Sequence, residues 1–162
     1  MLNFVIIGCG RISHKIVDGI VSNKDKAKLI GVSDLISSKM NEITLKYQKK
    51  VNSKDSILKK ENYKELLETL PIDIAIISTE SGYHEEIALD CLEKRIHVII
   101  EKPIAMSIQG AQKLVDKAKE KGVKLAACHQ NRFNYPIQLL KKAIVENRLG
   151  KVYTGTARVL WY

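Results

Sequence analysis

The sequence predicts an α/β fold in which helices cover both faces of a parallel sheet, and two observations support that prediction. Short apolar runs alternate with amphipathic stretches along most of the chain, as in repeated βαβ units. The runs at 74–77 and 98–100 are apolar at every position, which is typical of strands covered on both faces. The 162 residues are enough for one well-buried domain.

The alternation of patterns gives an order of elements. The apolar runs predict strands at Phe4–Ile7, Leu29–Ser33, Ile72–Ser78, His97–Ile100 and Lys124–Cys128, with a weaker one near Val51 or Ile57. The amphipathic stretches predict helices at Ile12–Ser22, Ser38–Tyr47, Tyr63–Leu70, Tyr83–Lys94 and Ser107–Lys121. In the last of these helices, Ser107 is the expected N-cap, and Gly122 follows its end.

The end of the chain follows a different pattern. Pro136–Glu146 is expected to be helical, with Gly150 closing the turn after it. Lys151–Tyr162 then alternates, with Tyr153 and Trp161 on its apolar face, which predicts a strand of an antiparallel sheet. An unpaired strand is a liability, so we expect the chain to be the front part of a longer protein. The predicted domains are residues 1–133 and, as the start of an α+β substrate domain, residues 134–162.

Composition excludes several classes of protein. With 45% hydrophobic and 28% charged residues, the chain resembles a globular protein, and no apolar run suits a membrane span or a signal peptide. Cys9, Cys91 and Cys128 lie far apart, so neither a disulfide framework nor a metal site is expected, and the cytoplasm is the expected location. The net charge of +9 raises the alternative of nucleic-acid binding. The basic residues are spread along the chain without interleaved aromatics, which favours a solvated surface.

A glycine turn follows the first predicted strand directly and opens the first helix, in the segment Gly8–Ser13. Gly8 permits a tight turn, Gly10 lets a pyrophosphate approach the main chain, and the helix N-terminus supplies N–H groups. This placement indicates a dinucleotide-binding Rossmann domain, the alternative being a plain βα turn. Ser13 stands where the fingerprint prefers Gly or Ala, so strand and helix should lie slightly further apart there.

Asp34 ends the second predicted strand, where a carboxylate accepts hydrogen bonds from the adenosine ribose. It also repels a 2′-phosphate, and no Arg follows it closely, although Lys39 is near in sequence. These features favour NAD over NADP as cofactor. The alternative interpretation is that Asp34 merely caps the following loop.

Further motifs make the sequence resemble the Gfo/Idh/MocA oxidoreductases. That family combines the glycine turn, an acidic residue after the second strand, a Thr-containing loop leading to a His, and Glu-Lys-Pro after the fifth strand. Here the last two are Ser78–His84 and Glu101–Pro103, and the resemblance covers the whole chain. Where the family usually has T-P-N, this chain has Thr79, Glu80 and Ser81, and so departs from the family pattern at Glu80 and Ser81.

The resemblance implies a role for each matching residue. The resemblance implies that Gly8, Gly10, Arg11 and Ile12 contact the pyrophosphate. It implies that Asp34 binds the adenosine ribose and that Ser78 and Thr79 stack against a ring of the cofactor. His84 is expected to touch the cofactor, although a surface position is the alternative. Glu101 is expected at the nicotinamide ribose, and the stretch 129–133, with Gln130 and Arg132, at the nicotinamide side.

Lys102 is the candidate catalytic residue, beside the reacting carbinol of the substrate. If it is buried there, desolvation disfavours its ammonium form and suits it to proton relay. The alternative is a surface lysine before a turn proline. A cis Lys102–Pro103 bond is also expected from the resemblance. The family's usual general acid/base is a His on the second domain, so the 162-residue chain is expected to lack its own and to be inactive alone.

The resemblance therefore predicts an NAD-dependent dehydrogenase that transfers hydride between the nicotinamide and a secondary alcohol of a sugar, cyclitol or nucleotide sugar. The segments 129–134 and 150–152 are similar to the branch that oxidises nucleotide-sugar uronates at C3. A homo-oligomer is expected, without a nucleic-acid or membrane partner. The rival hypothesis is a non-catalytic NAD(H)-binding module that acts as a redox sensor or assembly subunit.

Overall fold

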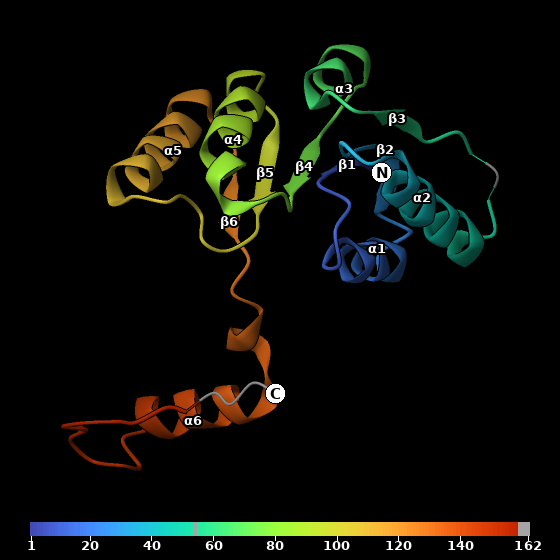
Figure 1. Cartoon of the computed structure of the whole chain (residues 1–162). Helices are drawn as coiled ribbons and strands as arrows, with labels where there is room; N and C mark the ends of the chain where they lie inside the picture. Colours follow the sequence, from blue (N-terminus) through green and yellow to red (C-terminus); the bar gives the residue numbers. More distant parts are fainter. Residues whose placement is uncertain (54, 159–162) are drawn as a thin grey trace. The chain divides into compact units, whose positions relative to one another are not determined.

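The computed structural model describes residues 1–53 and 55–158 (Figure 1). The chain divides into two compact units, Met1–Cys128 and a second unit that begins at His129. Each unit is described by itself below. None of the helices in the described residues is long and apolar enough to cross a membrane.

The first unit is built on a six-stranded sheet in which all neighbouring strands are parallel. Its strand order is β3-β2-β1-β4-β5-β6, with the bounds Leu58–Lys60, Ala27–Ser33, Leu2–Ile7, Ile74–Ile77, His97–Ile100 and Leu125–Ala127 respectively. This is the doubly wound Rossmann order, and it confirms the predicted fold class. The order reverses between β1 and β4, where Ile7 is paired with Ile77. Open parallel sheets bind ligands at such a switch point, beyond the carboxyl ends of the strands.

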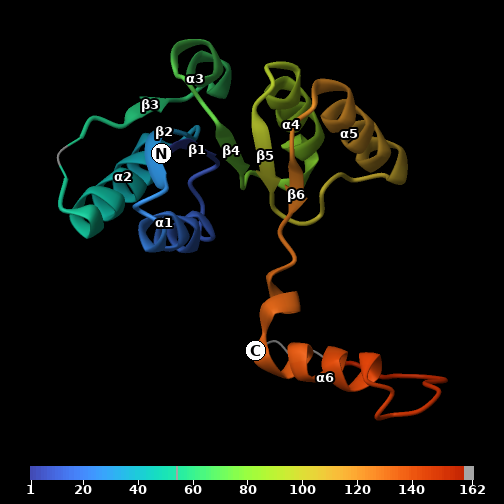
Figure 2. The same cartoon turned by 180° about the vertical axis from the view of Figure 1, so that it is seen from behind.

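Helices enclose the sheet on both faces. Helices α1 (Ser13–Ser22) and α2 (Ser37–Val51) contribute to one apolar core, whose fully buried members include Val17 and Ile43. Helices α3 (Tyr63–Thr69), α4 (His84–Glu93) and α5 (Ile108–Lys121) contribute to the other, with Leu66, Leu92 and Leu114 fully buried. Figures 1 and 2 show α4 and α5 side by side. The apolar runs are therefore covered on both faces, as predicted.

Most predicted boundaries agree with the structure to within a few residues, and the main difference lies at the end of α2. The helix continues to Val51, which packs against the core, and ends at Asn52 in the left-handed conformation with a φ of 52°. A strand at Val51 was therefore wrong, whereas the alternative near Ile57 agrees with β3 at Leu58–Lys60. In α5, the Ser107 hydroxyl accepts from the Gly110 N–H and caps the helix as predicted.

The second unit contains a short 3-10 helix η2 (Gln130–Phe133) and helix α6 (Tyr135–Val145). Gly150 has a φ of 60°, in agreement with the predicted turn after the helix. The predicted strand over 151–162 does not form in residues 151–158, and Trp161 lies outside the described residues. A strand needs a partner for its N–H and C=O groups, and the described residues supply none to this segment.

Candidate cofactor-binding site

The turn after β1 is closed tightly against the neighbouring strands. Gly8 has a φ of 93°, a conformation that favours glycine. A Cβ at position 8 would lie 2.5 Å from the main-chain carbon of Ser78 and 2.6 Å from the nitrogen of Thr79. The Gly8 N–H donates to the Ser33 carbonyl at 2.8 Å, and the Gly8 carbonyl accepts from the Ser78 hydroxyl at 2.7 Å. Position 8 therefore requires glycine for both conformation and space.

Gly10 borders open space instead. A Cβ at Gly10 would meet no heavy atom within 4 Å. The carbonyl of Gly10 accepts from the N–H of Ser13 at 3.1 Å and also from its hydroxyl, so the buried Ser13 fits where the fingerprint prefers a smaller residue. Ile12 occupies the N-cap position of α1, its side chain makes no capping hydrogen bond, and the neighbouring Arg11 is exposed. The open space at Gly10, at the start of α1, suits the approach of a phosphate to the main chain.

Asp34 connects the glycine turn to the loop after β2. Its Oδ2 accepts from the Cys9 N–H at 2.7 Å, and its Oδ1 accepts from the Ile36 N–H at 2.8 Å. The loop-capping interpretation therefore describes part of what Asp34 does. Each carboxylate oxygen retains capacity for a further donor such as a ribose hydroxyl. Burial, followed by the charge of Asp34, raises the pKa of the Cys9 thiol to about 12, which keeps that thiol neutral.

One cavity of about 680 Å³ brings several predicted residues together at the switch point of the sheet. It is lined by five of the predicted cofactor residues, namely Gly8, Gly10, Asp34, Ser78 and Thr79. A hollow of about 660 Å³ along the outer face of α5 contains none of them and is lined by residues of that helix alone. The cavity at the switch point is therefore the candidate site.

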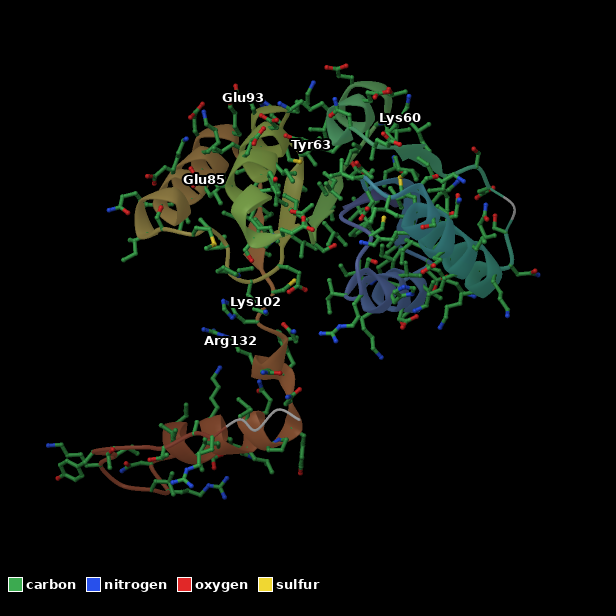
Figure 3. The ribbon with its side chains drawn as sticks, in the orientation of Figure 1. Lys60, Tyr63, Glu85, Glu93, Lys102 and Arg132 are labelled. Carbon is green, nitrogen blue, oxygen red and sulfur yellow. The ribbon has the colours of Figure 1, made fainter. Side chains whose placement is uncertain are left out.

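Sequence reasoning missed part of this lining. Lys39 in α2, together with Glu61, Asn62 and Tyr63 after β3, also faces the cavity. The side chain of Tyr63 is labelled in Figure 3. Its hydroxyl donates to Asp90 Oδ2 at 2.7 Å, and burial, followed by this hydrogen bond, raises the pKa of the tyrosine. The rule that ligands bind beyond strand ends could have pointed to residues 61–63. They were missed because the sequence left two positions open for this strand, near Val51 or Ile57.

Tyr83, Glu80 and Glu86 complete the polar lining on the β4 side. Four acidic side chains, Asp34, Glu61, Glu80 and Glu86, line the cavity, while Lys39 is the one basic residue among its lining residues. The excess of negative charge in the lining disfavours the binding of an additional phosphate group in this cavity.

Glu101 and Lys102 follow the end of β5. The Glu101 N–H donates to the Ile77 carbonyl at 2.9 Å, and the thiol of Cys128 lies next to the Glu101 carboxylate. Burial, and secondarily Glu101, raises the pKa of Cys128 to about 11. The Lys102–Pro103 bond is cis, as expected. Lys102 itself is exposed (Figure 3), so the described residues do not supply the desolvation that a proton relay through it was expected to use.

His84 differs most from its expected position. Its side chain is 1% exposed, and it is among the largest fully buried side chains of the unit. Nδ1 lies 2.7 Å from the Pro103 carbonyl and Nε2 lies 3.1 Å from the Thr79 carbonyl. Both ring nitrogens therefore face main-chain oxygens, which leaves neither for a cofactor.

Gln130 and Arg132 belong to η2 in the second unit, where both are exposed. The Arg132 side chain is labelled in Figure 3. The Arg132 carbonyl accepts from the side-chain amide of Gln138 within the same unit. Their expected contact with a nicotinamide stays a prediction. Among the described residues, no group of three or more His, Cys, Asp or Glu side chains is placed to hold a metal ion.

Comparison with known proteins identifies the kind of domain. Residues 2–129 match the family model GFO_IDH_MocA, described as an oxidoreductase family with an NAD-binding Rossmann fold. The D-glucoside 3-dehydrogenase of Escherichia coli (strain K12) is 28% identical over 159 residues, which are 98% of this chain and 43% of that protein. The myo-inositol 2-dehydrogenase of Thermotoga maritima is 25% identical over 146 residues, 90% of this chain and 41% of that protein.

Among solved structures, the WlbA dehydrogenase of Chromobacterium violaceum, in complex with NADH and UDP-GlcNAcA, is similar to this chain with a TM-score of 0.85 and 29% identity. That match covers 94% of this chain and 42% of the WlbA chain. The WlbA dehydrogenase of Bordetella pertussis, also with NADH and UDP-GlcNAcA, has a TM-score of 0.84 and 28% identity, with coverage of 94% and 44%. The chain thus spans less than half the length of these relatives.

Proposed function

The chain belongs to the Gfo/Idh/MocA family of oxidoreductases, and on that premise we propose that it is the cofactor-binding part of an NAD-dependent dehydrogenase. Its substrates would be secondary alcohols of sugars, cyclitols or nucleotide sugars. The observation that carries the proposal is the cavity at the switch point, which joins the glycine turn, Asp34 and Thr79 in one space. The predicted homo-oligomer and the cytoplasmic location remain parts of this proposal.

The geometry of the cavity fits a dinucleotide. The open space at Gly10 and the uncapped start of α1 suit a pyrophosphate, whereas Gly8 is packed too tightly for any side chain. Asp34 is held by two main-chain N–H groups, which orient its oxygens toward the cavity that it lines. When bound, NAD supplies the hydride acceptor. The residues of this chain bind and orient it.

The acidic lining supports the preference for NAD over NADP. A 2′-phosphate on the adenosine ribose would meet the carboxylate of Asp34, with Glu61 lining the same cavity. Lys39 is the residue that opposes this preference, since it lines the cavity too. The carboxylates outnumber it, so NAD is the proposed cofactor.

The substrate class rests on the relatives. A glucoside 3-dehydrogenase, an inositol dehydrogenase and a dehydrogenase with a bound nucleotide-sugar uronate all match this chain over nine-tenths or more of its length. Lys102, exposed at the end of β5, would position the reacting carbinol. Because Lys102 has no desolvated environment among the described residues, we give it a positioning role and no role in proton transfer.

The test separates binding from turnover. NADH and NADPH are titrated into the chain by calorimetry, and NADH formation is followed with NAD and a panel of glucosides, inositols and nucleotide-sugar uronates. We expect tighter binding of NADH than of NADPH, and no turnover by the 162-residue chain. Equal or tighter binding of NADPH would contradict the role of Asp34. Robust turnover by the verified chain would place the catalytic base within it. A full-length protein that binds NADH but oxidises none of the alcohols would favour a redox-sensing module.

A further inference from the structure

One buried imidazole joins a loop that lines the candidate site to the turn that carries Lys102. His84 begins α4, and its ring lies between the Thr79 carbonyl, in the loop after β4, and the Pro103 carbonyl, in the turn after β5. Thr79 lines the cavity, and Pro103 follows Lys102 directly. The two segments come from neighbouring strands of the sheet but are separated by all of α4 in the sequence.

The number of hydrogens on the ring decides which of these contacts is a hydrogen bond. A carbonyl oxygen only accepts, and a neutral imidazole carries hydrogen on one nitrogen alone. The contact of Nδ1 with the Pro103 oxygen is 2.7 Å, whereas that of Nε2 with the Thr79 oxygen is 3.1 Å. The shorter contact favours hydrogen on Nδ1, with which the ring donates to the Lys102–Pro103 turn and packs against the Thr79 loop.

The Lys102–Pro103 turn has few other attachments. Among the described residues, the main-chain hydrogen bonds of Lys102 and Pro103 are a contact of 3.3 Å from the Lys102 N–H to the Glu101 carboxylate and the bond from His84. Proline has no N–H to donate. The carbonyl of Pro103 is therefore the firm attachment of this turn to the body of the unit, and the lysine side chain projects from a main chain fixed at that point.

We propose that His84 is a positioning residue, which holds the Lys102–Pro103 turn in place by an Nδ1–H bond and aligns it with the loop that carries Thr79. It acts through these segments and touches neither cofactor nor substrate. The consequence for binding rests on the proposed function, in which both segments face the bound cofactor. The consequence for the turn itself is independent of that function.

The ring tautomer is the first test. Nitrogen-15 NMR of the histidine-labelled chain at pH 8, with His84→Gln to assign the signal, reports which ring nitrogen carries hydrogen. We expect hydrogen on Nδ1 of His84. Hydrogen on Nε2 would overturn the proposal, since the ring would then donate to Thr79 and leave the Pro103 carbonyl without a donor.

Three variants form the second test, because they differ in the donor they retain. His84→Asn places an amide N–H near the Nδ1 position, His84→Gln places one near the Nε2 position, and His84→Phe fills the space with neither. The readouts are NADH affinity and the acetylation rate of Lys102, resolved by peptide mass spectrometry with Lys94 as internal control.

We expect His84→Asn to stay within about twofold of the unaltered chain in both readouts. His84→Gln and His84→Phe should each weaken NADH binding by about fivefold and change the rate of Lys102 acetylation by about fivefold. That factor corresponds to the loss of one net hydrogen bond. Equal behaviour of His84→Asn and His84→Gln would overturn the proposal, whether or not His84→Phe folds. If the unaltered chain does not bind NADH, the proposed function fails, while the tautomer and the acetylation rates still decide the role of His84.

Discussion

The two compact units of this chain differ in how far their apolar side chains are buried. In the first unit, Val5, Leu66 and Ile77 are fully buried, and two cores cover both faces of the sheet. In the second unit, α6 buries no residue, and Leu140 and Ile144 remain 51% and 48% exposed. Buried apolar surface is the main source of folding free energy. The difference indicates that the first unit carries the stability and the candidate site, while the apolar face of α6 is left unused within the described residues.

The largest expected effect tests the core of the first unit. Leu66→Ala removes a fully buried side chain of α3 and should lower the free energy of unfolding by about 2–5 kcal/mol, through lost burial and a residual cavity. The matched control Leu140→Ala, in α6, should change it by less than about 0.5 kcal/mol. Urea denaturation followed by circular dichroism measures both. A similar loss for the two variants would break the comparison between the units.

The second prediction concerns a substitution that should weaken NADH binding and leave the free energy of unfolding unchanged. Gly10→Val places a side chain in the open space beside α1 and should weaken NADH binding by about 100-fold or more, equivalent to about 2.7 kcal/mol. The free energy of unfolding should stay near that of the unaltered chain, because nothing lies within 4 Å of the added Cβ. Gly19→Ala, within α1 and also facing open space, is the control and should leave NADH affinity unchanged. Unchanged affinity in Gly10→Val would reject this placement of the pyrophosphate.

A smaller effect is expected at Asp34. Asp34→Asn retains an oxygen for one main-chain N–H but removes the charge, so the ratio of NADH to NADPH affinity should fall by about tenfold, or about 1.4 kcal/mol. Asp73→Asn is the matched control, because Asp73 also accepts a main-chain bond, from the Asn3 N–H at 2.7 Å, and does not line the cavity. Calorimetry with both cofactors gives the ratio. A ratio that moves equally in the two variants would mean that Asp34 acts only as a loop cap.

The smallest effect on binding should follow removal of the second unit. A chain ending at Cys128 retains the sheet and every residue that lines the cavity, so NADH affinity should change by less than about twofold. Titration of NADH into both chains by calorimetry measures the change. A strong loss of affinity would instead assign part of the site to the segment with Gln130 and Arg132.

Agreement between sequence and structure is best where the signal is local. The glycine turn, the cap at Ser107 and the apolar strands follow from a few adjacent residues, and each is found where it was predicted. Agreement fails where a strand forms only if it pairs with a segment that is distant in the sequence. Strand β3 consists of three residues paired with β2, and the stretch 151–158 has the alternation of a strand but no partner within the described residues.

The amino-acid sequence by itself determined the α/β class, the turn at Gly8 and the capacity of Asp34 to accept hydrogen bonds, because periodicity, the need for a positive φ and carboxylate chemistry are properties of adjacent residues. Only the tertiary structure decided that His84 is buried between Thr79 and Pro103, that Tyr63 lines the cavity and that Lys102 is exposed. The physical reason is that these surroundings come from loops after different strands, which meet only because the parallel sheet brings their carboxyl ends to one edge.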